Sequence, residues 1–185
     1  MSNVPLEIQA DVLGLTPLCP DEVTVVRGQA SVAKSAGEVQ SIRLIPENPP
    51  ACPDALDAII AADHVLLGPG SWFTSVIPHL LVPEILDALV TTRASRTLVL
   101  NLAPADETEG YSSARHLEIL AEHAPRLSCD HIVADPTFIG DDAHVADFAR
   151  SLGAELIIES VRLSDGSPRH DANRLASVFA DILGR

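Results

Sequence analysis

The sequence predicts an α/β protein in which a Rossmann-like, mostly parallel sheet is flanked by helices and preceded by an N-terminal β-hairpin. From residue 54 onward, short apolar runs alternate with helical stretches, as in parallel sheets whose strands are joined by crossover helices. Aromatic residues make up only 3% of the chain, so Val, Leu, Ile and Ala must fill the interior, as in sheets that are apolar on both faces. The 185 residues suffice for one core, and we predict a single domain over residues 1–185.

The first part of the chain alternates between apolar and polar residues, as half-buried strands do. Residues 23–32 and 39–45 show this alternation, and they flank a turn-forming insert at 35–38. These stretches predict the β-hairpin. The Pro-rich segment 46–53 cannot continue a central strand, because proline lacks the N–H donor, so we predict a hinge there. Residues 54–62 predict a short helix.

The later elements are predicted from length and hydrophobic period. The apolar runs are short enough to be buried strands, and the stretches between them have the length and spacing of helices. The last helix carries an apolar face that ends at Leu183. The predicted strands are 63–67, 97–101, 131–133 and 155–158, and the predicted helices are 80–92, 112–123, 143–152 and 171–183.

The charge balance argues against one broad class of partner. Twelve Lys and Arg residues stand against 26 Asp and Glu residues, which gives a net charge of −14. Proteins that bind the phosphate backbone of nucleic acids use clustered cations, so we predict no nucleic-acid partner.

The sequence also indicates a compartment. No apolar run approaches the roughly 18 to 20 residues that span a bilayer, and residues 1–4 lack a basic segment followed by an apolar core. We therefore expect no membrane partner. The three cysteines, Cys19, Cys52 and Cys129, are far apart and show no zinc-binding spacing, as expected of thiols in the reducing cytoplasm.

The main candidate for ligand binding is the glycine turn, which we define as residues 68–71, Gly-Pro-Gly-Ser. Glycines let a ligand approach the backbone closely, and a helix that begins there would direct N–H groups toward an anion. The alternative is a plain strand-to-helix turn in which Ser71 caps the helix. The position at the carboxyl end of a strand favours phosphate binding. The candidate residues are Gly68, Pro69, Gly70, Ser71, Thr74 and Ser75.

A second loop follows the next strand and is predicted to face the same crevice. Tyr can stack on a ring, and Asn offers both a donor and an acceptor. Asp106, Glu107 and Glu109 are a possible site for Mg²⁺, which prefers oxygen ligands, or simply a solvated acidic loop with Ser112 as a helix cap. We assign no protein metal site and no certain cofactor. The binding candidates here are Asn101, Gly110, Tyr111 and Ser112.

The remaining residues give no catalytic arrangement. The seven histidines include no His-Glu-x-x-His pair, and no Ser stands in a Gly-x-Ser-x-Gly turn, so no catalytic residue is assigned. His116 is either directed into the crevice or a surface residue. Cys129 is predicted to be a buried apolar residue and Asp171 a helix cap.

Residues 63–123 resemble the gluconeogenesis factor (YvcK-like) family, which belongs to the CofD-like superfamily together with 2-phospho-L-lactate transferase. Weaker similarity extends over nearly the whole chain, including residues 26–29 and 169–171. The segments that carry the resemblance are 68–71 with Thr74 and Ser75, 76–83, and 107–112.

The resemblance implies a function and an alternative. It implies a cytoplasmic, non-catalytic regulatory protein that binds a nucleotide-sugar, such as a UDP-sugar, or another phosphate-bearing small molecule, and that supports cell shape on gluconeogenic carbon. The alternative is a Mg²⁺-dependent 2-phospho-L-lactate transferase-like enzyme. A third interpretation is a structural domain without a ligand.

The chain departs from the family pattern in two ways. It resembles only the C-terminal part of family members, without the glycine-rich phosphate loop and the acidic residue that follows it. Residues 102–106 also differ from the family's usual acidic loop, so contacts carried over to Ala105 or Asp106 are not supported. An open edge of an apolar sheet is a template for pairing, so we expect a homo-oligomer.

Overall fold

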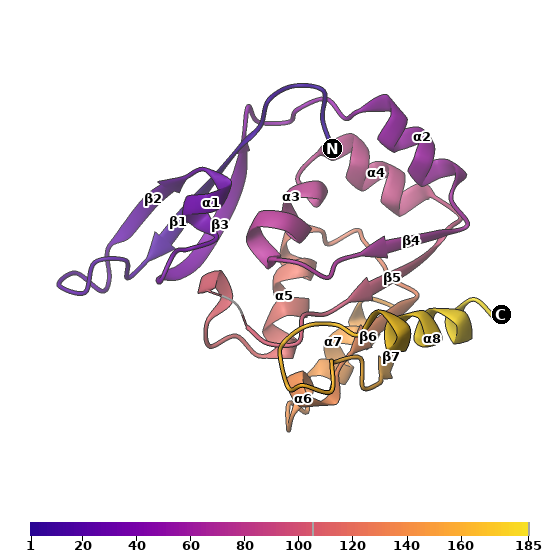
Figure 1. The fold of residues 1–185 in the computed structure, drawn as a ribbon. Helices are drawn as coiled ribbons and strands as arrows, with labels where there is room; N and C mark the ends of the chain where they lie inside the picture. Colours follow the sequence, from indigo (N-terminus) through magenta and orange to yellow (C-terminus); the bar gives the residue numbers. More distant parts are fainter. Residues whose placement is uncertain (105, 185) are drawn as a thin grey trace.

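Two separate sheets organise the computed structural model, which describes residues 1–104 and 106–184. A three-stranded antiparallel sheet has the order β2-β1-β3, and a four-stranded parallel sheet has the order β4-β5-β6-β7 (Figure 1). The predicted fold class is therefore confirmed. The strands are β1 (Glu7–Leu13), β2 (Val23–Arg27), β3 (Glu38–Ile45), β4 (His64–Leu67), β5 (Ser95–Val99), β6 (His131–Ala134) and β7 (Glu155–Ile158).

The N-terminal hairpin exists, but its strands differ from those predicted. β1 pairs with β2 on one side and with β3 on the other, so residues 23–32 and 39–45 are not partners. β2 ends at Arg27 because Gly28, with a φ of 88°, turns the chain into the short helix α1 (Gln29–Val32). The predicted turn at 35–38 thus joins a helix to β3. The pairing was missed because β1 was not predicted.

The five longer helices lie within a few residues of their predicted positions. Short helical segments were not predicted, because a single turn has too little periodicity to detect. The longer helices are α2 (Pro53–Ala61), α4 (Pro83–Thr91), α5 (Ser113–His123), α7 (Val145–Ser151) and α8 (Ala172–Ile182). The short segments, besides α1, are the π-helix η1 (Trp72–Val76), α3 (Ile77–Leu80), the 3₁₀-helix η2 (Asp106–Thr108) and α6 (Pro136–Ile139).

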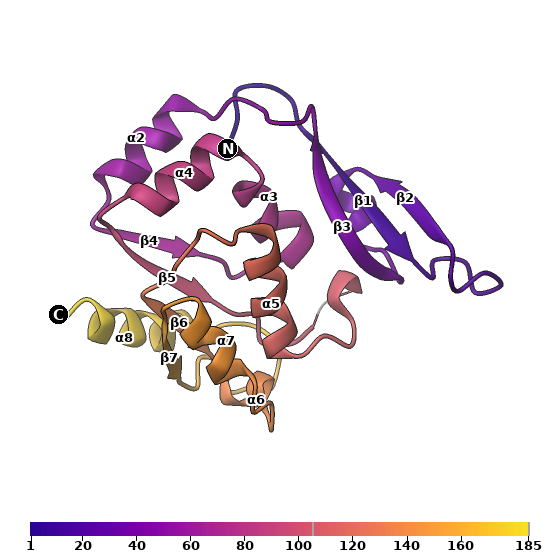
Figure 2. The same cartoon turned by 180° about the vertical axis from the view of Figure 1, so that it is seen from behind.

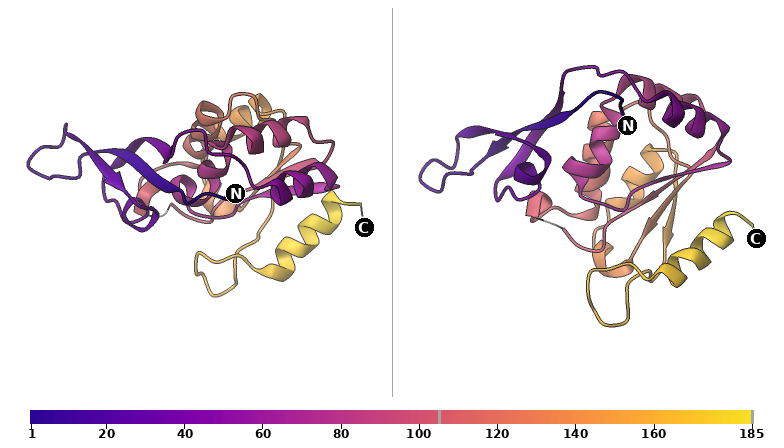
Figure 3. Two further views of the ribbon diagram at one scale, coloured as in Figure 1. Left: turned by 90° about the horizontal axis from the view of Figure 1, so that it is seen from above. Right: turned by 45° about the horizontal axis from the view of Figure 1, so that its top comes forward.

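Helices cover the parallel sheet on both faces. α8 lies on one face, and α4, α5 and α7 lie on the other (Figure 3). Neighbouring residues of β5 show this division: Leu98 belongs to the main core, whereas Val99 packs with Val133 and Val178 under α8. Strands buried on both faces explain why they read as continuous apolar runs in the sequence.

The antiparallel sheet lies beyond the carboxyl ends of β4 and β5 (Figures 1 and 2). The Pro-rich segment joins β3 of this sheet to α2, and its role as a hinge stays a prediction. Ser2 forms a bridge with Ala51, and the Ala51 N–H donates to a Glu84 carboxylate oxygen at 2.7 Å. The two sheets therefore enclose the place where ligands bind in open α/β sheets.

Within the part of the chain that the structure describes, no single helix is long and apolar enough to cross a membrane. Residues Trp72–Leu80 and Pro83–Thr91 reach that length and composition only as a pair, with a bend of 74° between them.

Candidate functional site

The glycine turn follows β4 directly and is held in place by the next strand's loop. Gly68 has a φ of 71°, and a Cβ there would lie 2.7 Å from the Val99 carbonyl oxygen, so only glycine fits. The Asn101 side chain clamps the following glycine: its Nδ2 donates to the Gly70 carbonyl at 2.9 Å, and its Oδ1 accepts from the Gly70 N–H at 3.1 Å. The structure thus brings the two loops together, with the Asn101 amide holding the turn.

The helical run after the turn begins with a buried carboxylate. The Phe73 N–H donates to Glu107 Oε1 at 2.8 Å, and Glu107 is only 2% exposed. A carboxylate is favourable at a helix start, where unpaired N–H groups carry partial positive charge. Glu107 therefore takes a position that the sequence analysis had offered to a phosphate. The Ser71 side chain makes no capping hydrogen bond within the described part of the chain, which contradicts the alternative that it caps the helix.

The two remaining hydroxyl candidates differ in their surroundings. Thr74 is buried, and its carbonyl accepts from Gln29 Nε2 at 2.9 Å, which ties the antiparallel sheet to η1. Ser75 lines two cavities together with His79. His79 Nδ1 donates to the Ser75 carbonyl at 2.6 Å, so in the neutral imidazole the other ring nitrogen is an acceptor.

The cavities on either side of Ser75 and His79 have different walls. One, of about 530 Å³, is mostly apolar and lies beside β4; the other, of about 480 Å³, lies between η1 and the antiparallel sheet. Both volumes are typical of small-molecule sites. The first is lined by Met1, Ala55, Ala58, Ile59, Val65, Leu66, Leu67, Gly68, Pro69, Ser75, Val76, His79, Ile85 and Leu89, and the second by Met1, Leu6, Glu7, Ile8, Gly28, Gln29, Leu44, Thr74, Ser75, Pro78 and His79.

Tyr111 and Ser112 of the second loop have structural contacts. The Tyr111 ring lies edge-on to Phe73, with centroids 6.3 Å apart, and burial raises the pKa of its hydroxyl. Ser112 caps α5 by accepting from the Arg115 N–H at 3.2 Å, as its alternative interpretation predicted. Gly110, with a φ of 80°, forms the turn before them.

The acidic loop does not form a metal site in the part of the chain that the structure describes. There, no group of three His, Cys, Asp or Glu side chains is arranged to hold a metal ion. Glu109 is exposed, while Ala105 and the Asp106 side chain lie outside the described residues.

His116 is neither in the crevice nor on the surface. It is fully buried, its Nδ1 donates to the Ser112 carbonyl at 2.8 Å, and its ring packs edge-on against Trp72 with centroids 5.1 Å apart. Burial lowers the pKa of His116 and keeps the imidazole neutral. Cys129 is buried as predicted, and burial raises the pKa of its thiol to about 12.

A cation that the sequence analysis missed reaches the same edge of the sheet. Arg162 donates from Nη2 to the carbonyl of Leu102, one residue from Asn101. The buried Asp135 carboxylate positions it by accepting from the N–H groups of Val161 and Arg162 at 3.0 and 3.1 Å. Burial alone would raise the pKa of Asp135, but its hydrogen bonds outweigh this effect and hold the pKa below its usual value.

The residues missed on the other side of the site had a weak signal. Gly28 and Gln29 belong to the 26–29 segment that resembles the family, and His79 belongs to the 76–83 segment. Arg162, in contrast, is 60 residues from its partner Leu102 and belongs to no motif. Only the fold brings it to this edge.

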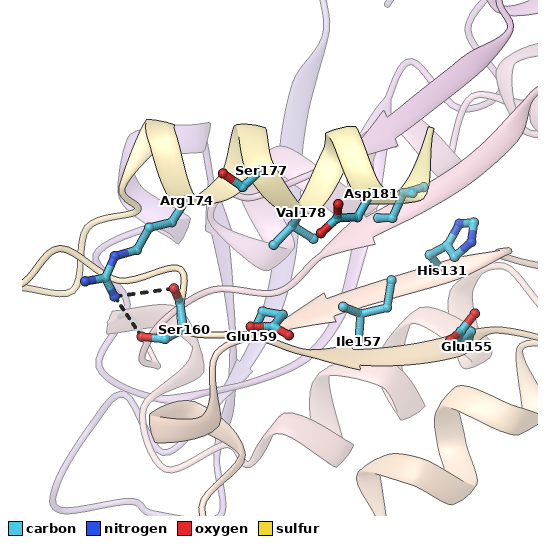
Figure 4. Close-up of a pocket in the computed structure, with 10 residues that line it drawn as sticks. His131, Glu155, Ile157, Glu159, Ser160, Arg174, Ser177, Val178 and Asp181 are labelled. Atoms are coloured by element: carbon cyan, nitrogen blue, oxygen red, sulfur yellow. Dashed lines mark hydrogen bonds between the residues drawn. The ribbon is translucent and has the colours of Figure 1, made fainter. Parts of the chain in front are cut away.

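A further cavity lies away from the glycine turn, between α8 and β7 (Figure 4). It measures about 670 Å³ and is bordered by the carboxylates of Glu155, Glu159 and Asp181. Its cation, Arg174, is already held by Ser160 Oγ at 2.9 Å. We do not assign the ligand site to this groove, because it runs along an edge strand and carries mostly negative charge.

The arrangement is that of a CofD-like α/β protein. It combines a parallel sheet with a glycine turn after β4, and the Asn101 side chain from the loop after β5 holds this turn. A family model described as "2-phospho-L-lactate transferase CofD" matches residues 1–155, and the chain belongs to this family. The predicted family is thereby confirmed.

The relatives within this family carry a more particular name. The Gluconeogenesis factor of Bacillus subtilis (strain 168) is 29% identical over 174 residues, which cover 86% of this chain and 55% of that protein. A Mycobacterium tuberculosis (strain ATCC 25618 / H37Rv) protein, whose name gives the same factor as a provisional assignment, is 44% identical over 190 residues, which cover 100% of this chain and 55% of that protein.

Solved structures agree with these relatives. A crystal structure of a upf0052 family protein from Bacillus halodurans matches with a TM-score of 0.78 and 25% identity, and the match covers 96% of this chain and 59% of that one. The chain thus spans little more than half the length of these three proteins.

Proposed function

We propose that this protein is a regulatory protein of the gluconeogenesis factor type, which binds a nucleotide-sugar such as a UDP-sugar at the carboxyl edge of its parallel sheet. We place it in the cytoplasm, where its free thiols would persist, and propose a role in cell shape during growth on gluconeogenic carbon. The names of its relatives support the first part of this proposal.

The observation that carries the binding proposal is the clamped glycine turn, whose Gly68 and Pro69 line the 530 Å³ cavity. Asn101 fixes the Gly70 peptide, so the turn is ordered before a ligand arrives and less entropy is lost on binding. Ser75 and His79 offer polar contacts where the cavities meet. A phosphate at this junction would leave room for a base or a sugar on either side.

The charges at this edge favour binding with a modest affinity. With a net charge of −14 the chain repels a diphosphate, and Arg162 is the cation that the fold brings to the edge. Mg²⁺ bound to the ligand would reduce the repulsion. We therefore expect nucleotide-sugar binding to strengthen when Mg²⁺ is present.

A second candidate function is Mg²⁺-dependent phospholactate transfer, which the matching family model favours. Transfer needs placed groups that neutralise developing charge. Glu107 already accepts the Phe73 N–H and is buried, which makes it a poor metal ligand or general base. This contact favours the binding protein over the enzyme.

Isothermal titration calorimetry tests the proposal directly. The chain is titrated with UDP-glucose, UDP-N-acetylglucosamine, UDP and inorganic phosphate, each with and without Mg²⁺. We expect a nucleotide-sugar to bind more tightly than phosphate, and His79→Ala to weaken that binding while the exposed His144→Ala does not. Heats equal to those of dilution for every nucleotide would refute the binding function, and turnover of a nucleotide-activated phospholactate would replace it with the transferase.

A further inference from the structure

The antiparallel sheet has one outer strand that is open to solvent. Among the described strands, β2 pairs with β1 alone, and it is the strand of this sheet that lies farthest from the parallel half in both views (Figures 1 and 2). The other outer strand, β3, is partly covered, because the Tyr111 hydroxyl donates to the Val39 carbonyl at 3.5 Å. β2 is therefore the edge of this sheet that a partner can reach.

The backbone of β2 directs alternate hydrogen-bonding groups toward this open edge. The Gly28 N–H donates to the Ile8 carbonyl of β1 at 2.8 Å. At the other end, the Glu22 carbonyl accepts from the Gly14 N–H at 3.2 Å. The even-numbered residues of this stretch thus face β1, and the odd-numbered residues direct their N–H and C=O groups away from it. The odd-numbered residues of β2 are Val23, Val25 and Arg27.

The side chains along this edge are apolar and exposed. Val25 is 49% exposed and shares the solvent face of the sheet with Val23. The strand contains no Asp, Glu, Lys or Pro, although native proteins usually protect an open edge with charged residues or proline. Leu18, in the loop that leads into β2, is 92% exposed. This edge is therefore suited to pairing with another strand.

We propose that β2 is the contact surface between two copies of this chain, which pair their β2 strands across a two-fold axis at Val25 and join the two antiparallel sheets into one. Identical strands that form a hydrogen-bonded pair about a two-fold axis run antiparallel, and both existing pairs of this sheet are antiparallel. The edge strands β4 and β7 lack this match, because every described pair in their sheet is parallel. The proposal does not depend on the ligand proposed above.

The charges at the two ends of β2 complement each other in this arrangement, which favours a second copy over an unrelated strand. Asp21 and Glu22 precede the strand and Arg27 ends it, and all three residues are exposed. Pairing centred on Val25 places Arg27 of each copy beside Glu22 of the other. Arg27 forms no ion pair with a described residue of its own chain. The net charge of −14 opposes association, so we expect a weak dimer.

Sedimentation velocity of the 185-residue chain between about 1 and 200 µM tests this contact. We expect the chain to shift from monomer to dimer over this range, and exchange of the Val25 N–H to slow as the dimer forms. Val25→Lys should keep the chain monomeric, because it places two like charges opposite each other on the axis. The matched control is Ile158→Lys in the edge strand β7, where Ile158 is also 49% exposed, and it should leave dimerisation unchanged.

An exchange of charges tests the orientation of the two strands. Arg27→Glu should weaken dimerisation by about fivefold or more, because it places like charges together at both ends of the paired strands. Adding Glu22→Arg to the same chain should restore dimerisation, since opposite charges then meet again. If Val25→Lys unfolds, these two variants replace it, because both positions are exposed.

The opposite results would overturn the proposal. A chain that stays monomeric at the highest concentration would show that β2 does not join two copies. A dimer that survives Val25→Lys, or that Ile158→Lys disrupts equally, would place the contact elsewhere on the molecule. A double charge variant that dimerises no better than Arg27→Glu alone would contradict the antiparallel pairing centred on Val25.

Discussion

Replacing Asn101 with alanine should loosen the glycine turn without removing any part of the core. The substitution deletes two hydrogen bonds to Gly70, of 2.9 and 3.1 Å, at a partly buried position. At about 1 kcal/mol for each bond, the free energy of unfolding should fall by about 2 kcal/mol, which is about 30-fold in the unfolding equilibrium. For a chain of this size the midpoint of thermal unfolding should fall by about 4–8 °C.

Urea unfolding and amide exchange measure the two consequences of this substitution separately. Exchange of the Gly70 N–H should accelerate by more than the global loss of stability explains, because the hydrogen bond that protects it is gone. Asn173→Ala is the matched control, since Asn173 is exposed at the start of α8 and should change stability little. A loss below about 0.5 kcal/mol, together with unchanged exchange at Gly70, would refute the view that Asn101 holds the turn.

Three further predictions concern positions outside this clamp. Gly68→Ala should destabilise the protein by more than about 2 kcal/mol, because its Cβ would lie 2.7 Å from a carbonyl oxygen at a positive φ. The control Gly166→Ala, at a φ of 78° with open space around it, should cost about 1 kcal/mol. Equal losses of stability in urea unfolding would contradict the steric argument. Burial lowers the pKa of His116 below the unfolded value of about 6.5, so its contribution to stability is present above that pH and is lost as the pH falls below it. The fall in unfolding free energy between about pH 7.5 and 5.5 should therefore be smaller in His116→Gln than in the original chain, and identical pH profiles would show that His116 is not responsible. In the native protein, iodoacetamide should modify the exposed Cys19 and spare Cys129, whose thiol pKa is raised to about 12; mass spectrometry after partial labelling would detect the opposite order.

Local patterns in the sequence were sufficient to predict the strands and longer helices in the parallel half of the molecule. The four strands and the longer helices of that half were predicted within a few residues, because apolar runs of strand length and helical periodicity are properties of neighbouring residues. The glycine turn was also found locally, since Gly68 has a positive φ that other residues rarely adopt. These features also carried the resemblance to the family.

The antiparallel half was predicted less well, because strand pairing is not a local property. β1 alternates between polar residues, which include Gln9 and Asp11, and apolar residues, which is a strand pattern that our sequence analysis did not assign. In the structure Asp11 pairs with Arg43 of β3 at 2.8 Å, across 32 residues of sequence. Alternation marks a strand, but it does not identify the strand with which it pairs.

The roles of the site residues were decided by the tertiary structure alone. The sequence indicated that Asn101 and Glu107 lie near the glycine turn. It did not indicate which backbone groups they bind, 31 and 34 residues away. Arg162 reaches Leu102 across 60 residues, through a loop that the buried Asp135 orders. Hydrogen bonds between distant residues form only when the core has fixed the elements that carry them, so the sequence located the turn and the fold determined which residues hold it.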